Sequence, residues 1–197
     1  MQRLYYTIAL IAVVLFACSS PTYKYPHVII KTGFGNIEAE IYTDKAPKTA
    51  AAFLSYVDSG LYDRSDFYRV LSNDNQPSNA VKAKLIQGGI WTTNTEKAMT
   101  LPGIPHESTK QTGIHHTDGV LSMARDAPGT ATTEFFVCVG DQPGLDFGGE
   151  NNPDGQGYAA FGKVVKGMNV VRKIYDQPEQ DQSFTPPVAI ISITRVR

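Results

Sequence analysis

Eight short apolar or alternating runs, separated by polar loops, recur from residue 27 to the end of the 197-residue chain. Runs of this kind, bounded by Gly, Pro, Asn and Asp, are typical of β-strands. They cover residues 27–31, 36–42, 67–71, 84–87, 119–124, 133–139, 158–164 and 188–196. Between the first two runs, the sequence Thr-Gly-Phe-Gly at 32–35 predicts a hairpin turn.

Only two segments have helical periodicity. The first follows Pro47, which suits the first turn of a helix, and stops before Gly60, which can end one. The second covers residues 168–175. Many short strands and few helices favour a mainly β fold. We predict one domain over residues 27–197, a closed eight-stranded antiparallel β-barrel capped by two α-helices, because closure removes the exposed strand edges.

The first 17 residues form a separate unit. Arg3 supplies a short positive region, and the 14 residues from 4 to 17 carry no charge. An apolar run of this length is too short to cross the roughly 30 Å of a bilayer core, but it suits the core of a signal peptide. We therefore predict that residues 1–17 are removed on export.

The segment Leu-Phe-Ala-Cys at 15–18 resembles a bacterial lipoprotein processing site, in which Cys18 is lipidated and becomes the new N-terminus. Plain cleavage without a lipid is the alternative. With a lipid on Cys18, residues 18–26 would tether the domain to a membrane of the cell envelope, facing the periplasm or the cell surface. Cys138 would then lack an intramolecular partner, and its place in an apolar run predicts a buried core residue.

Several classes of function are poorly supported. The formal net charge is −1, so no strong field would attract nucleic acid. His106, His115 and His116 match no zinc spacing, so we predict loop or surface histidines and no metal site. The glycines of residues 148–157 lack a following helix pattern and a Gly-Lys-Ser/Thr element, so no phosphate cradle is predicted. Nothing in the sequence requires a cofactor or more than a monomer.

Six segments resemble the cyclophilin family of peptidyl-prolyl cis-trans isomerases, in order and with similar spacing. They are FYRV at 67–70, IQGG at 86–89, GVLSMA at 119–124, EFFV at 134–137, LD at 145–146 and YAAFGKV at 158–164. The resemblance runs from about residue 27 to the C-terminus. It implies a closed barrel, proline-containing polypeptides as partners, and isomerisation of X–Pro bonds without a cofactor.

The resemblance also implies roles for individual residues. Arg69 matches the catalytic arginine of the family. Gln87 matches a glutamine that contacts the substrate backbone, and Phe136 and Leu145 match the walls of the proline pocket. Leu85 falls at an apolar pocket position, and Ala124 and Arg125 fall where the backbone of the family contacts the bound peptide. Glu134 replaces a common Gln, and Tyr158 stands where many eukaryotic members have His; both are also expected to bind substrate.

Four departures from the family pattern bear on the site. Lys84 replaces a common aromatic residue, so one wall is thinner or formed by the methylenes of the lysine. Glu134 adds a carboxylate that can pair with Arg69. Gly144 stands where cyclosporin-sensitive members have Trp, which predicts weak cyclosporin binding. Residues 72–83 lengthen the path between the two site strands and are expected to form a loop beside the site.

The leading hypothesis is an active isomerase that assists the folding of exported proteins. The alternative is a catalytically weak module that binds proline-containing segments as a chaperone or scaffold of the cell envelope, which Lys84 and Glu134 favour. Retention of Arg69, Gln87 and Phe136 together favours the enzyme, because a pure binding module has no need of the arginine. A structural envelope lipoprotein is a third possibility, supported only by the predicted anchor.

Overall fold

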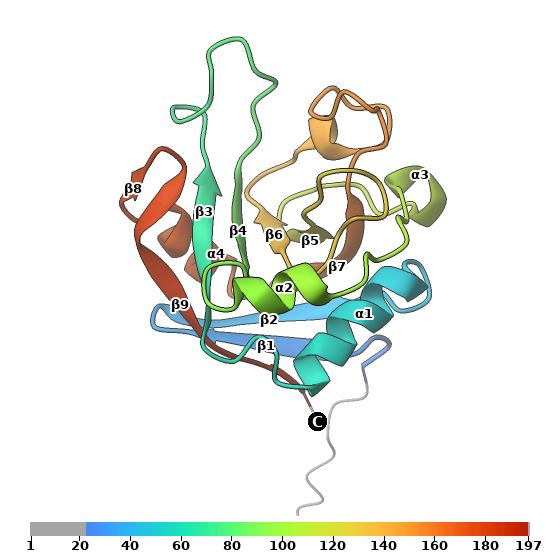
Figure 1. Cartoon of the computed structure of the whole chain (residues 1–197), viewed down its shortest axis with the longest axis vertical. Coiled ribbons are helices and arrows are strands. Elements are labelled where there is room, and N and C mark those ends of the chain that lie inside the picture. Colours follow the sequence, from blue (N-terminus) through green and yellow to red (C-terminus); the bar gives the residue numbers. More distant parts are fainter. Residues whose placement is uncertain (1–22, 197) are drawn as a thin grey trace, which may run out of the picture.

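A computed structural model describes residues 23–196 and shows an antiparallel barrel (Figure 1). The sheet order is β1-β2-β7-β5-β6-β4-β3-β9, and pairing of β1 with β9 closes the ring of eight strands. A ninth, two-residue strand, β8, pairs with β9. The strands are β1 His27–Thr32, β2 Gly35–Ile41, β3 Ser65–Leu71, β4 Leu85–Gly89, β5 Val120–Met123, β6 Phe135–Cys138, β7 Ala159–Lys166, β8 Glu179–Gln180 and β9 Ser183–Arg195. The predicted closed barrel and the hairpin at residues 32–35 are therefore confirmed.

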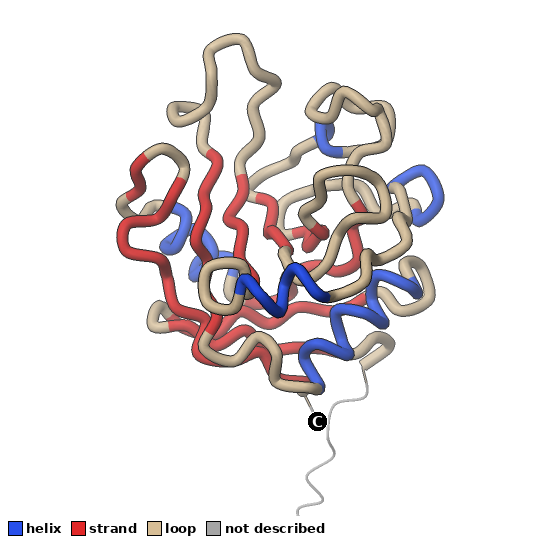
Figure 2. Tube along the Cα trace, viewed as in Figure 1, coloured by secondary structure: helices blue, strands red, loops and turns tan. Residues whose placement is uncertain are grey.

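Residues 23–196 contain four α-helices rather than the predicted two (Figure 2). The predicted pair is confirmed as α1 Pro47–Asp58 and α4 Met168–Tyr175. The additional helices are α2 Thr95–Thr100 and α3 Thr109–Thr112, and a 3-10 turn covers Pro143–Leu145. With only one or two turns each, α2 and α3 are too short for a periodic apolar face, and local capping marks them instead.

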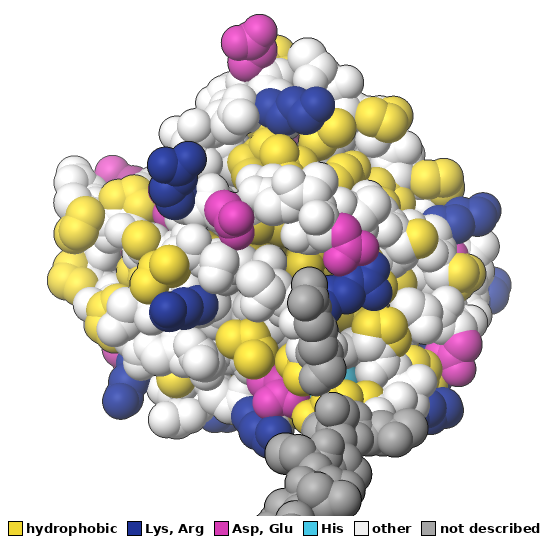
Figure 3. Space-filling view, turned by 90° about the horizontal axis from the view of Figure 1, so that it is seen from below, with side chains coloured by type: hydrophobic (Ala, Val, Ile, Leu, Met, Phe, Trp, Pro, Cys, Tyr) yellow, Lys and Arg dark blue, Asp and Glu magenta, His cyan; other side chains and the backbone are white. Residues whose placement is uncertain are grey.

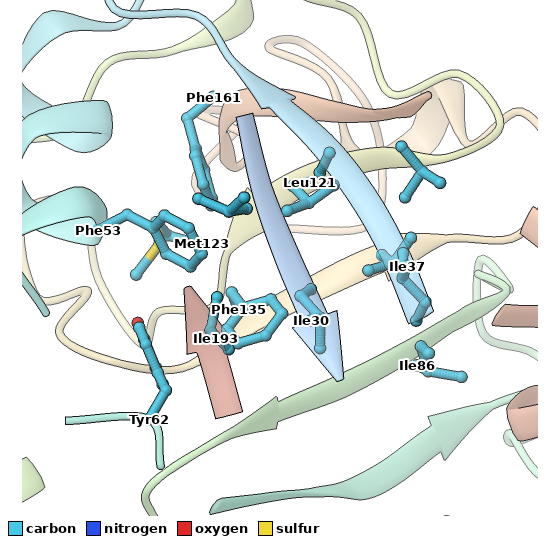
Figure 4. Packing of buried hydrophobic residues seen from close by; sticks show 14 of the residues in the cluster. Ile30, Ile37, Phe53, Tyr62, Ile86, Leu121, Met123, Phe135, Phe161 and Ile193 are labelled. Carbon is cyan, nitrogen blue, oxygen red and sulfur yellow. The ribbon is translucent and has the colours of Figure 1, made fainter. Parts of the chain in front are cut away.

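Strand alternation divides the buried side chains into two clusters. Phe135 and Val137 of β6 point into the barrel, where they join the main core, whose packing Figure 4 shows. Phe136 and Cys138 alternate with them and point outward into a second, smaller cluster. The prediction that Cys138 is buried is confirmed. The second cluster lies on the outer face of β4 and β6, which is where the candidate site is found.

A long-range hydrogen-bonded cap holds the N-terminus of α1. The buried Glu107 carboxylate accepts hydrogen bonds from the backbone N–H groups of Lys48 and Thr49, at 3.2 and 2.8 Å, and from the Thr49 hydroxyl at 2.7 Å. A helix N-terminus favours a negative group because its first N–H groups lack intrahelical partners. Glu107 thus ties the loop before α3 to α1.

The N-terminal predictions lie largely outside the described residues. This applies to the signal peptide at residues 1–17 and to Cys18. Of the predicted tether at 18–26, residues 23–26 are described, and the buried Tyr25 donates a hydrogen bond to Asp44 at 3.1 Å. Within residues 23–196, no helix has both the length and the apolar character needed to cross a bilayer.

One face of the molecule shows acidic and basic side chains interspersed with hydrophobic ones (Figure 3).

Candidate active site

A cleft of about 400 Å³ is lined by outward-facing residues of β3, β4 and β6 and by residues of the neighbouring loops. The 71–85 and 139–158 loops emerge at the same end of the barrel (Figure 1). All nine residues that the resemblance assigned to the site line this cleft: Arg69, Leu85, Gln87, Ala124, Arg125, Glu134, Phe136, Leu145 and Tyr158. Seven further residues complete it: Tyr68, Leu71, Trp91, Asp126, Thr130, Thr132 and Asn151. The fold therefore gathers the expected residues, which the sequence spreads over 90 positions, into one cleft.

A β-bulge explains why two consecutive residues of β3 face this cleft. Phe67 pairs with Gly88 and Arg69 with Gln87, so Tyr68 is an extra residue without a partner in β4. Such an insertion breaks the alternation of side chains and re-aims the residues around it. Tyr68 and Arg69 consequently both line the cleft, whereas strict alternation would turn them to opposite faces.

The Arg69 guanidinium is held by two glutamine side chains. Its Nε and Nη2 groups donate to Oε1 of Gln182 at 3.2 and 2.7 Å, and its Nη1 group donates to Oε1 of Gln87 at 3.5 Å. Gln87 in turn donates through Nε2 to the Tyr68 hydroxyl at 2.7 Å. Among the described residues, no ion pair involves Arg69. The guanidinium group is therefore oriented by neutral amide oxygens, and its positive charge is not paired with a carboxylate.

The apolar part of the cleft centres on Phe136. The Tyr158 ring meets it edge-on, with ring centroids 5.4 Å apart, and the buried Leu145 belongs to the same cluster. The buried loop residue His116 stacks on the Phe136 ring. Its ring nitrogens form hydrogen bonds with Asp146 at 2.7 Å and with the Ser122 hydroxyl of β5 at 2.9 Å. Burial alone would raise the pKa of Asp146, but hydrogen bonds from His116 and its neighbouring histidine outweigh it and lower that pKa. These residues form an apolar wall of the cleft.

Ala124 and Arg125 line the cleft beside this wall: Ala124 packs against the Phe136 cluster, and the Arg125 guanidinium lies over the Tyr158 ring. The Arg125 guanidinium makes an ion pair with Asp154 at 2.7 Å and donates to the carbonyl of Gly157 at 2.6 and 2.9 Å. Its side chain is only 1% exposed. Arg125 thus locks two loops together and leaves its backbone, rather than its charge, at the cleft.

The suggested ion pair between Glu134 and Arg69 is wrong. The Glu134 carboxylate accepts hydrogen bonds through Oε1 from the N–H groups of Ile90 and Trp91, at 2.9 and 3.0 Å, and from the Thr133 hydroxyl at 2.9 Å. Burial raises the pKa of Glu134, although the neighbouring Tyr68 hydroxyl and these three bonds act to lower it. By hydrogen-bond geometry, its Oε2 atom is buried without a partner. Backbone donors that directly follow β4, the strand paired with that of the arginine, compete successfully for this carboxylate.

Of the other departures, the 72–83 insert forms a loop beside the cleft, as predicted. Lys84 is not among the described residues that line the cleft, so its methylenes form no wall there. Ala83, the last residue of the 72–83 insert, is buried instead in the Phe136 cluster. At Gly144, an added Cβ would lie 3.2 Å from Cγ1 of Val81, so the insert occupies the space that a larger side chain would enter.

Neither a reactive cysteine nor a metal cluster is found among residues 23–196. Burial raises the pKa of the Cys138 thiol far above its ordinary value, which keeps it protonated. No group of three or more His, Cys, Asp or Glu side chains in this part of the chain is arranged to hold a metal. The cleft offers a fixed guanidinium, amide groups and an apolar wall. These groups suit binding and electrostatic stabilisation without bond cleavage.

Comparisons with known proteins agree with this chemistry. Residues 27–195 match the family described as cyclophilin type peptidyl-prolyl cis-trans isomerase/CLD. A peptidyl-prolyl cis-trans isomerase of Acinetobacter baylyi is 39% identical over 172 residues, covering 84% of this chain and 83% of that protein. Peptidyl-prolyl cis-trans isomerase B of Escherichia coli is 37% identical over 148 residues, covering 75% and 82%.

Solved structures share the fold. A cyclophilin-type isomerase of Cryptosporidium parvum superposes with a TM-score of 0.67 at 21% identity, covering 88% of this chain and 98% of that one. A second structure of the same protein, obtained in the presence of the dipeptide Ala-Pro, gives 0.66 at 21% identity, covering 87% and 99%. The family match spans the whole described barrel, and the chain therefore belongs to the cyclophilin-type peptidyl-prolyl cis-trans isomerases.

Proposed function

We propose that this isomerase is an exported, lipid-anchored enzyme that rotates X–Pro bonds in proteins of the cell envelope and so assists their folding, with Arg69 as its catalytic residue. The single observation that carries the catalytic assignment is the guanidinium fixed by Gln87 and Gln182 at the edge of an apolar cleft. The export assignment depends on the apolar segment at residues 1–17 and on Cys18.

The reaction requires no covalent intermediate. Rotation of the X–Pro amide has a barrier of about 18–20 kcal/mol, because resonance is lost at the perpendicular geometry. In that geometry the proline nitrogen becomes pyramidal and gains a basic lone pair. Arg69 donates a hydrogen bond to this nitrogen in the twisted state, whereas the planar nitrogen of the ground state is a poor acceptor. The interaction is therefore stronger in the transition state, which is the condition for catalysis.

The other cleft residues hold the two sides of the rotating bond. Phe136 and Leu145 grip the proline ring, and Gln87 contacts the substrate backbone. The backbone of Ala124 and Arg125 binds the segment before the proline. With the ring fixed on one side, the preceding carbonyl is free to turn, so binding energy contributes to orientation.

The catalytic proposal is tested by exchange NMR on an X-Pro model peptide. Wild-type protein should accelerate exchange strongly, and Arg69→Ala should lower kcat/KM by about 10²-fold or more, the usual cost of removing one preorganised donor. Arg69→Lys is the matched control, because it keeps the charge but lacks the planar fork that two glutamines hold. Full activity in a folded Arg69→Ala variant would contradict the assignment.

The anchor is tested separately. The full chain is expressed in a bacterium, and the mature protein is analysed by cell fractionation and mass spectrometry. We expect a membrane-bound product that begins at an acylated Cys18, and a Cys18→Ala variant that loses the acyl mass. A soluble wild-type product without added acyl mass would contradict the lipid anchor while leaving the isomerase assignment intact.

A further inference from the structure

Gln182 makes hydrogen bonds with all its polar groups. Its backbone N–H donates to the Glu179 carboxylate at 2.7 Å, and its carbonyl accepts from the N–H of Val70 at 2.8 Å. Its side-chain Oε1 accepts from Nε and Nη2 of Arg69 at 3.2 and 2.7 Å, and its Nε2 donates to the carbonyl of Asn75 at 3.1 Å. The side chain therefore joins the arginine to the insert at residues 72–83.

The backbone at Gln182 is one that this residue type seldom adopts. Residues 181 and 182 form the two-residue turn between β8 and β9, next to β3 (Figure 1), and both have positive φ, 50° for Asp181 and 70° for Gln182. Such turns favour Gly, Asn or Asp, because other side chains are strained there. A glutamine at this position costs stability, and strained residues cluster where a side chain serves the site.

The two partners of the amide determine its orientation. A guanidinium offers only donors and a carbonyl offers only an acceptor, so the amide oxygen must face Arg69 and the NH₂ group must face Asn75. The Arg69 guanidinium thus donates to a neutral amide oxygen, which orients the group without neutralising its charge. A carboxylate at this point would hold the guanidinium equally well but would weaken its field at the substrate.

The insert is attached to the same support. Asn75 accepts a hydrogen bond from the N–H of Ser72 at 2.8 Å and donates to the carbonyl of Val70 at 3.1 Å. These bonds hold the Asn75 backbone beside β3, where its carbonyl accepts the hydrogen bond from Nε2 of Gln182. The arginine, the β8–β9 turn and the start of the insert form one hydrogen-bonded unit.

We infer that Gln182 is a positioning residue that orients the Arg69 guanidinium, and that the insert takes part in this orientation through Asn75. The inference rests on the catalytic role proposed above for Arg69. It assigns a task in the reaction to a residue 113 positions away in the sequence and to a loop outside the family segments.

The deciding comparison is Gln182→Gly against Asp181→Gly in the full-length protein. Glycine relieves the positive-φ strain at either position, and in Gln182→Gly this relief offsets the loss of the side-chain hydrogen bonds, so both variants should unfold at a thermal midpoint close to that of wild type. Gln182→Gly should lower kcat by about tenfold with KM little changed, because a hydrogen bond to a charged group is lost. Asp181→Gly, whose side chain is exposed, should keep wild-type kcat.

Two further readouts separate positioning from general structural effects. The NMR signal of the Arg69 Nε–H group should shift and exchange faster with water in Gln182→Gly but not in Asp181→Gly. In Gln182→Glu that signal should stay protected while kcat still falls, because the new carboxylate pairs with the arginine charge.

Equal kcat in the two glycine variants, with Arg69→Ala inactive, would overturn the inference alone. Full activity in Arg69→Ala would instead overturn the catalytic role of the arginine and, with it, this inference.

Discussion

Replacing Glu134 with glutamine should stabilise the protein at neutral pH and remove part of its pH dependence. One carboxylate oxygen of Glu134 accepts three hydrogen bonds, while Oε2 is buried without a partner. In Glu134→Gln the amide oxygen can keep the three bonds, and a neutral NH₂ group takes the place of Oε2. The substitution preserves the shape of the side chain, removes its charge and exchanges one acceptor for a donor.

The size of the effect follows from two opposing contributions. Burying a charged carboxylate costs more free energy than burying a neutral amide, whereas hydrogen bonds to a charged acceptor are roughly twice as strong as neutral ones. The raised pKa of Glu134 shows that burial outweighs these bonds, so the charged form is disfavoured in the folded protein. Each pKa unit corresponds to about 1.4 kcal/mol, and we expect Glu134→Gln to be more stable than wild type by about 1 kcal/mol at pH 7.5.

The direction of the pH dependence follows from linkage. Above the raised pKa of the folded state, the carboxylate is charged in both states and the folded protein is penalised. As the pH falls through that pKa toward the ordinary value of 4.5, the folded state binds the proton first, so wild type gains stability. The advantage of Glu134→Gln should therefore be largest at neutral pH and shrink as pH 4.5 is approached.

The assay is urea denaturation followed by circular dichroism, at several pH values between 4.5 and 7.5, for wild type and Glu134→Gln. Glu150→Gln is the matched control, because Glu150 is an exposed glutamate and its substitution removes one charge without relieving burial. An advantage of Glu134→Gln that does not change with pH, or a loss of stability at pH 7.5, would refute the reasoning.

Three other predictions concern the scaffold and the cleft. Glu107→Ala should lower the free energy of unfolding by about 2–3 kcal/mol in urea denaturation, because two backbone N–H groups and the Thr49 hydroxyl lose a charged partner; a change under 0.5 kcal/mol would show that water replaces the cap. Phe136→Ala should raise KM for X-Pro peptides and destabilise the fold by about 3 kcal/mol, because it empties the centre of the outer cluster; an unchanged KM would place the proline elsewhere. Cyclosporin should bind weakly in calorimetry, because position 144 is a glycine and Val81 occupies the space beside it; a nanomolar Kd would contradict this.

Much of the fold was predictable because its signals are local. Period-two alternation and Gly-rich turns marked the eight barrel strands, and α4 was predicted with the same boundaries that the structure shows. The start of β9 was missed: the strand begins at Ser183, but the prediction began at residue 188 because Pro186 and Pro187 interrupt the strand pattern. Helices α2 and α3 were missed because one or two turns carry too little periodicity.

The sequence by itself determined the strand and helix pattern, the family segments, and therefore which nine residues to expect around one cleft. Only the tertiary structure decided what those residues contact. The bulge at Tyr68 turned two consecutive side chains to the same face, Glu134 bound backbone N–H groups instead of Arg69, and Gln182 reached the arginine from a distant turn. Alternation and motif spacing depend on neighbours along the chain, whereas hydrogen-bond partners depend on competition among groups that folding brings together. No local pattern records the outcome of that competition.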